Sequence, residues 1–137
     1  MLIDKTSRQQ ASDAKLYRFG VLAFFMMPLC YLGMFIIFGA LLEIPRTPDL
    51  SERIAYVASE QRLISLAYVL GYFIFGLLLL IATQALHRML SGVSTHLLNS
   101  ASLFGFIWVV LMMCAGMTAM VGMKTMVALY PLSLIHI

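Results

Sequence analysis

Three long stretches of this chain contain no charged residue, and they constrain its fold more than any other feature. They run from Phe19 to Leu42, from Leu63 to Leu86 and from Leu97 to Met123. Each exceeds the roughly 20 apolar residues that a helix needs to cross a hydrocarbon core of about 30 Å. Because lipid offers the backbone no hydrogen-bond partners, such stretches must be helical. The sequence therefore predicts an all-α fold, a polytopic transmembrane helix bundle with three visible spans.

The composition agrees with a membrane protein. Hydrophobic residues make up 62% of the chain and charged residues 11%, whereas soluble domains have about 45–50% and about 25%. A cleaved signal peptide does not explain the first apolar stretch, because a signal core has only about 7–15 residues and ends in small residues. The stretch is longer and ends in "GALLEIPR", so we interpret it as a retained helix.

Charged residues and prolines divide the chain into segments. Residues 1–18 form a polar, basic tail that is expected to be mobile or interfacial, and residues 19–131 form the transmembrane unit. Pro131 is expected to end the last helix, because proline cannot donate a backbone hydrogen bond. Within the unit we expect spans at about 19–42, 63–86 and 97–123, joined by an interfacial helix at about 50–62 and by a short hairpin loop.

The interfacial helix has a recognisable start. Two prolines in "EIPRTPD" prevent the first span from continuing. Asp49 then follows, with Glu52 three residues later, which is the acidic version of a capping box. We therefore predict that Asp49 is an N-cap and that a helix starts at Leu50. In the first span, Pro28 frees the carbonyl of Phe24 and permits a kink.

The distribution of Lys and Arg predicts the orientation. The side with the tail and the second loop has five Lys and Arg residues. The other side, with the first loop and Lys124, has four. Cytoplasmic segments are enriched in basic residues, so we expect a cytoplasmic N-terminus in a bacterial inner membrane. The net charge of +3 resides at helix ends, where it meets lipid headgroups, and it does not indicate a nucleic-acid partner.

The last six residues, "LSLIHI", differ in character from the rest of the chain. They resemble the translation of a transposase adapter end used to prepare sequencing libraries, although a genuine short apolar terminus is the alternative. On the first interpretation residues 132–137 are a non-native scar, which is excluded from fold reasoning. The natural protein would then continue with further helices, which would be partners of the visible spans.

The layout from Leu16 to Pro131 resembles bacterial multi-pass membrane families that are catalogued as domains of unknown function. The resemblance lies in a basic tail, a proline-containing loop before "ERIAYVASEQRLISLAYVLGYFIFGLLLL", and "ALHRML" at the end of the second span. It implies more than three spans in the complete protein. It supplies no catalytic residues.

Two sets of residues are candidate metal ligands. Met113 and Met117 share a face of the third span with Met120, and thioethers suit Cu(I). His87 and His96 flank the second loop on one side, and imidazole is a common ligand of metals and haem. Methionine is also an adaptable packing residue, and a third ligand is not evident for the histidines. We therefore expect no cofactor.

Small residues four apart predict where helices approach closely. Intramolecular packing is the preferred interpretation and homo-oligomerisation the alternative. The pairs are Ala67 and Gly71, Ala101 and Gly105, Ala115 and Ala119, and Thr118 and Gly122.

The sequence contains no catalytic constellation, and its spans contain no acidic residue for a proton relay. We therefore expect an integral membrane protein that is not an enzyme, an accessory or interaction component that acts through helix packing in the lipid bilayer. One alternative is the N-terminal part of a small-molecule or ion transporter. A further alternative is a membrane metal or haem protein.

Overall fold

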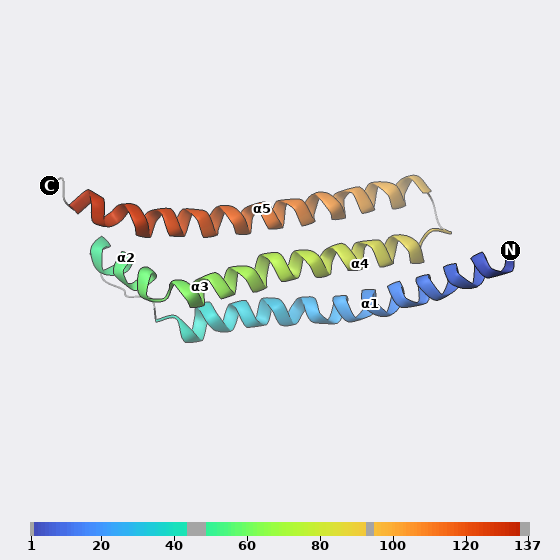
Figure 1. Cartoon of the computed structure of the whole chain (residues 1–137), viewed down its shortest axis with the longest axis horizontal. Helices are drawn as coiled ribbons and strands as arrows, with labels where there is room; N and C mark the ends of the chain where they lie inside the picture. Colours follow the sequence, from blue (N-terminus) through green and yellow to red (C-terminus); the bar gives the residue numbers. More distant parts are fainter. Residues whose placement is uncertain (1, 44–48, 93–94, 135–137) are drawn as a thin grey trace.

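The computed structural model describes residues 2–43, 49–92 and 95–134, and nearly all of them are helical (Figure 1). No strand occurs in these three ranges, so the predicted all-α fold is confirmed. The elements are α1 (Leu2–Ile36), the π-helix η1 (Ile37–Leu41), α2 (Leu50–Ser59), α3 (Gln61–Tyr68), the π-helix η2 (Val69–Ile74), α4 (Phe75–Met89) and α5 (Thr95–Leu134).

Three helical stretches are long and apolar enough to cross a membrane. They are Ser12–Leu41, Gln61–Met89 and His96–Tyr130. Between 11% and 28% of their most apolar windows is buried inside the molecule. Side chains this apolar and this exposed are stable only in contact with lipid or with other proteins. The fold is therefore that of an integral membrane protein.

The three long helices form a single layer in which α4 occupies the centre (Figure 1). On one side α4 packs against α1, and on the other side it packs against α5. Within the described residues no backbone contact joins α1 to α5. Consecutive helices run in opposite directions, so short connections suffice to join them.

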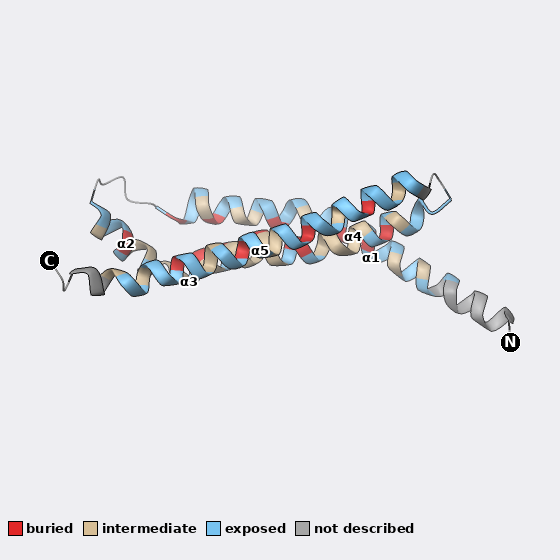
Figure 2. Cartoon of the chain, turned by 90° about the horizontal axis from the view of Figure 1, so that it is seen from above, coloured by how far each residue is buried: buried red, intermediate tan, exposed pale blue. Residues whose placement is uncertain are grey.

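Each flanking helix buries one narrow seam against its neighbours. The buried or half-buried residues alternate at spacings of four and three, which is the pattern of left-handed helix packing. Figure 2 shows the buried residues confined to a narrow band between wide exposed faces. The seam of α1 continues into η1 and comprises Leu16, Gly20, Ala23, Met27, Cys30, Met34 and Ile37, and that of α5 comprises Leu98, Ser102, Gly105, Val109, Met112, Gly116, Ala119 and Met123.

Glycines allow the closest approach between helices. A Cβ atom at Gly20 in α1 would lie 2.3 Å from the Cβ of Ala85 in α4. A Cβ at Gly116 in α5 would lie 2.6 Å from the Cβ of Tyr72 in η2. Both distances are far below van der Waals contact, so only glycine fits at these crossings.

The predicted start of the interfacial helix is confirmed. Asp49 is the N-cap of α2, and its Oδ1 accepts a hydrogen bond from the backbone N–H of Ser51 at 2.9 Å. Its Oδ2 accepts a second from the Ser51 hydroxyl at 2.7 Å. The helix ends at Ser59 rather than near residue 62, because the backbone at Glu60 leaves the helical conformation. The chain then turns into α3, η2 and α4 as one continuous rod (Figure 1).

Two ends of helices differ from expectation. The polar tail is helical from Leu2 onward and continuous with the first span, and an ion pair between Asp13 and Arg88 attaches it to α4. The prediction that Pro131 ends the last helix is wrong, because α5 continues to Leu134. The proline removes its own hydrogen bond to Val127, and the turn around it remains helical. The end of the suggested scar, 135–137, lies outside the described residues.

Candidate functional site

The strongest candidate site is a cavity of about 450 Å³ at the end of the layer where α2 packs against α5. We call it the α2 cavity. It adjoins the buried cluster formed by Ile37, Leu42, Ile64, Ala67 and Met123. Its lining comes from the end of the first span, α2, α3 and α5, and comprises Phe38, Leu42, Arg53, Tyr56, Val57, Ile64, Tyr68, Ala119, Gly122, Met123 and Met126.

The lining combines an apolar floor with three hydrogen-bond donors. The donors are the guanidinium of Arg53 and the hydroxyls of Tyr56 and Tyr68. Among the described residues, none of these three groups forms a side-chain hydrogen bond or ion pair with the protein. A half-buried tyrosine hydroxyl normally has a partner. The cavity therefore offers donors that the protein itself does not use.

Helix geometry explains how these side chains converge. Arg53, Tyr56 and Val57 stand three and four residues apart, so they share one face of α2. Ile54 is buried and anchors the helix. On the opposite wall, the ring of Tyr68 contacts that of Phe38 edge to face, with centroids 5.8 Å apart. The cavity is thus built by packed elements rather than by loops.

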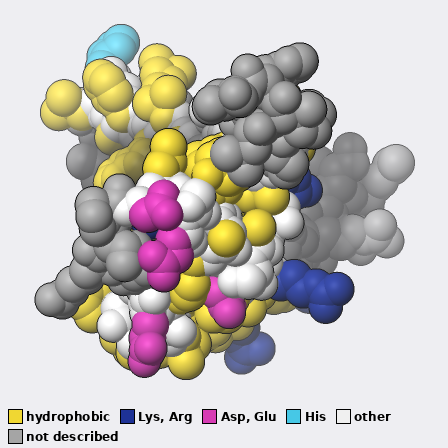
Figure 3. Space-filling view, turned by 90° about the vertical axis from the view of Figure 1, so that its left-hand side faces the viewer, with side chains coloured by type: hydrophobic (Ala, Val, Ile, Leu, Met, Phe, Trp, Pro, Cys, Tyr) yellow, Lys and Arg dark blue, Asp and Glu magenta, His cyan; other side chains and the backbone are white. Residues whose placement is uncertain are grey.

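The electrostatics of this end are mixed. Figure 3 shows acidic side chains gathered here, and the acidic residues between positions 43 and 60 are Glu43, Asp49, Glu52 and Glu60. The two hydrogen bonds from Ser51 lower the pKa of the Asp49 carboxyl below its ordinary value of 3.8. Among the described residues, Arg53 is the one cation in the lining of the α2 cavity. Arg62 and Lys124 also lie at this end of the layer, so acidic and basic groups there largely balance.

Two of the small residues predicted for helix packing line this cavity. They are Ala119 and Gly122. A Cβ atom added at Gly122 would meet no atom within 4 Å. This glycine therefore keeps space open in the α2 cavity and brings no helix close.

The other predicted packing residues divide between interfaces and open faces. Ala67 is fully buried in the core cluster, and a Cβ at Gly71 would collide with the side chain of Met34. A Cβ at Gly105 would lie 2.7 Å from the Cγ2 of Thr83. By contrast, Ala101 and Ala115 are exposed and face away from the neighbouring helices.

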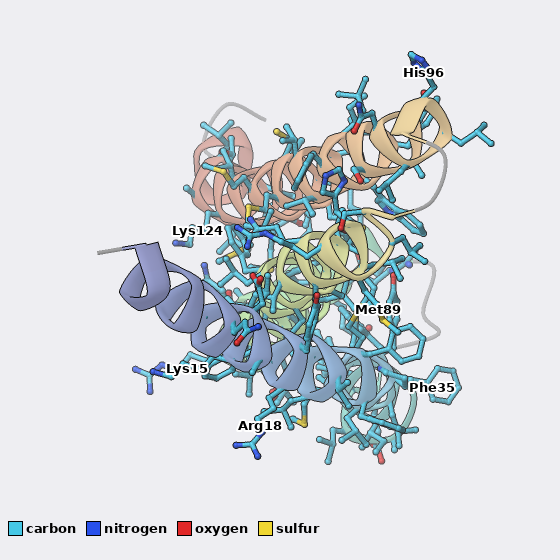
Figure 4. All side chains as sticks on the ribbon, turned by 90° about the vertical axis from the view of Figure 1, so that its right-hand side faces the viewer. Lys15, Arg18, Phe35, Met89, His96 and Lys124 are labelled. Atoms are coloured by element: carbon cyan, nitrogen blue, oxygen red, sulfur yellow. The ribbon has the colours of Figure 1, made fainter. Side chains whose placement is uncertain are left out.

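The two histidines, His87 and His96, have different surroundings. Ser102 donates its hydroxyl proton to the carbonyl of Leu98 at 2.9 Å, so it accepts from the Nδ1–H of His87 at 2.6 Å. Nδ1 of His87 is therefore the donor in this pair. His96 is exposed and points away from the bundle (Figure 4). It precedes Ser102 by six positions, about 9 Å along α5.

The two candidate methionine ligands have different surroundings. The side chain of Met113 packs beside Gly76 in α4, whereas Met117 is 57% exposed on the surface of α5. The described part of the chain contains no group of three or more His, Cys, Asp or Glu side chains that could hold a metal ion.

Sequence reasoning did not identify the α2 cavity as a site. It also missed the two π-helices, η1, which contributes Phe38 to the lining, and η2, which directly follows Tyr68. Such wide turns often occur near functional sites. No local signal marks them, because η2 has an ordinary apolar sequence, "VLGYFI".

Comparison with known proteins gives no relative. No family model, no curated protein and no solved structure matches this chain.

Proposed function

We propose that this integral membrane protein is a non-enzymatic accessory or interaction component, and that it acts by packing its exposed helix faces against further transmembrane helices. The observation that carries the proposal is the single-layer arrangement, in which α1 and α5 each bury one seam. A layer of three helices leaves both of its faces open. The lipid bilayer and neighbouring helices are the partners that suit such faces.

The accessible surface measures how open the layer is. It amounts to 10202 Å² for a chain of 15.3 kDa, whereas a compact soluble monomer of that mass exposes roughly 7,100 Å². No large side chain in the described residues is fully buried. The excess of about 3,000 Å² is comparable to the area that permanent protein assemblies bury.

One face of α5 suits helix association best. Ala101, Ala115 and Gly122 are exposed there, separated by multiples of seven residues. Small residues let a second helix approach closely, so that backbone and side chains gain van der Waals contact. Beside this face, α4 and α1 form an open apolar groove of about 350 Å³. Bulky side chains of a partner helix would fill that groove.

We place the protein in a bacterial inner membrane with its N-terminus in the cytoplasm. The excess of basic residues on the side of the tail and the second loop supports this orientation. Figure 4 shows that Lys15 and Arg18 project outward from α1 at this end. Such positions suit contact with anionic headgroups of the cytoplasmic leaflet.

Subunit counting in native membranes tests the proposal. The wild-type chain should occur in complexes larger than its own mass of 15.3 kDa. Ala101→Leu and Ala115→Leu should release the chain from those complexes, because each adds bulk where close approach is needed. Val110→Leu is the matched control, since Val110 is 59% exposed outside this small-residue face. A chain that is monomeric before mutation, or that responds equally to all three variants, would contradict the proposal.

A further inference from the structure

We propose that the α2 cavity binds a phospholipid. Its phosphate would lie against Arg53, Tyr56 and Tyr68, and the start of an acyl chain would cover the apolar floor. This inference does not rest on the proposed function, because a lipid can occupy the cavity in a monomer or in a complex.

The unused donors define the polar part of the ligand. Arg53, Tyr56 and Tyr68 line a single cavity, and their guanidinium and hydroxyl groups find no acceptor among the described residues. A phosphodiester supplies acceptors only, and arginine binds phosphate oxygens through paired, charge-assisted hydrogen bonds. At the depth of the lipid headgroups, a phosphate is the group that suits these donors.

The apolar floor defines the rest of the ligand. Leu42, Ile64 and Met123 are buried beneath the donors, and methionine adapts to flexible chains. A cavity of about 450 Å³ falls within the usual range of ligand pockets, about 300–1,000 Å³. It holds a headgroup and the first part of a chain, while the remainder of the lipid would stay in the bilayer.

The depth of the cavity matches the position of a lipid headgroup. Arg53 precedes the second spanning stretch, which begins at Gln61. Tyr68 follows Gln61 by seven residues, about 10 Å along the helix. The donors thus extend from the membrane surface to the top of the hydrocarbon layer, where the phosphate and glycerol groups of a phospholipid lie.

The charges at this end of the layer are mixed. Glu43, Asp49, Glu52 and Glu60 are offset by Arg53, Arg62 and Lys124, and no acidic residue in the described part of the chain lines the cavity. The phosphate and the acyl chain therefore define the ligand, whatever group is esterified to the phosphate.

Native mass spectrometry of the full chain in detergent tests the inference. The probes are dioleoyl phosphatidylethanolamine, dioleoyl phosphatidylglycerol, dioleoylglycerol and inorganic phosphate. We expect both phospholipids to be retained more strongly than dioleoylglycerol, with no measurable binding of inorganic phosphate. Binding of dioleoylglycerol as tight as that of the ethanolamine lipid would overturn the role of the phosphate.

Matched variants locate the site. Arg53→Gln should weaken retention of the ethanolamine lipid about tenfold to a hundredfold, since it removes charged hydrogen bonds. Arg62→Gln is its control, because Arg62 is exposed and does not line the cavity. Gly122→Phe should block the cavity without a clash, because the space at Gly122 is open. Val121→Phe is the corresponding control on the adjacent exposed surface.

Circular dichroism and the thermal midpoint show whether each variant is folded. If folded Arg53→Gln and Arg62→Gln lose the lipid equally, or if folded Gly122→Phe binds it as the wild type does, the lipid lies elsewhere and the inference is wrong.

Discussion

The crossing of α1 and α4 at Gly20 predicts a pair of substitutions that should compensate each other. In Gly20→Ala the new methyl group would lie 2.3 Å from the Cβ of Ala85. Carbon atoms pack at about 3.5–4.0 Å, so the helices must separate by about 1.2 Å or more at this point. The next nearest atom of α4, the Cα of Ala85, would lie 3.8 Å away, which is ordinary contact.

The structure gives both the size of the effect and its remedy. Overpacking a tight contact costs typically 1–3 kcal/mol, so Gly20→Ala should lower the free energy of unfolding by about that amount. Ala85→Gly removes the Cβ of Ala85, which is the atom that the new methyl group would overlap. In the double variant Gly20→Ala/Ala85→Gly the loss should therefore be largely recovered, because the clash is removed and the helix-propensity changes of the two substitutions, about 1 kcal/mol each, offset one another.

Equilibrium unfolding in mixed micelles measures all four proteins of this double-mutant cycle. The coupling energy should favour the double variant by about 1 kcal/mol or more, as for residues in direct contact. Gly39→Ala is the control, because its Cβ would meet the nearest atom, in Phe35, at 3.8 Å. If Gly20→Ala costs no more than Gly39→Ala, or if Ala85→Gly gives no recovery, the close crossing of α1 and α4 does not exist in the membrane.

Two further predictions concern orientation and the start of α2. In a variant without the native cysteines, a membrane-impermeant thiol reagent applied to intact cells should label Glu43→Cys and not Gly92→Cys, and the reverse pattern would place the N-terminus outside. The hydrogen bonds that lower the Asp49 pKa stabilise the charged carboxyl in the fold, so the cap is complete above pH 3.8 and is lost as the pH falls below it. Protection of the amides from Ser51 to Ile54, relative to the intrinsic exchange rate at each pH, should therefore fall as the pH drops below 3.8, and it should be low at every pH in Asp49→Ala. Equal protection in both proteins would argue against the cap.

Features with a local cause could be predicted from the sequence. The spans follow from runs of apolar residues, because the need for internal hydrogen bonds acts on each segment separately. The start of α2 was predicted from Asp49 with Glu52 three residues later, and Asp49 is the N-cap, although its carboxylate accepts its hydrogen bonds from Ser51. Neither inference depends on which helices become neighbours.

The faces that pack were harder to predict, because they depend on the partner. Small residues occur on several sides of α5, and the spacing of four identified Ala101 and Ala115, which are exposed. The true seam has the alternating spacing of four and three, and it includes larger residues such as Val109 and Met123. Only the position of α4 determines which of these stripes is covered.

The candidate site was even harder to predict, because its residues are far apart in the sequence. The lining of the α2 cavity comes from positions 38 to 126, and the partners in the Asp13–Arg88 ion pair are 75 residues apart. In addition, η2 widens the turn between Tyr68 and Phe75 and changes which side chains face α5. A regular helical wheel therefore misplaces residues on one side of that turn.

The length of α5 sets a relation between the protein and the thickness of its bilayer. Its apolar stretch of 35 residues is about 52 Å long, whereas the hydrocarbon core is about 30 Å thick. An average tilt of about 20° shortens the span by only a few ångström. The residues from Lys124 onward would therefore stand among the headgroups, and Met126 from this part of α5 lines the α2 cavity. A thinner bilayer increases the tilt of such a helix, so membrane thickness should alter the contact between α5 and α2 and thereby the opening of the α2 cavity.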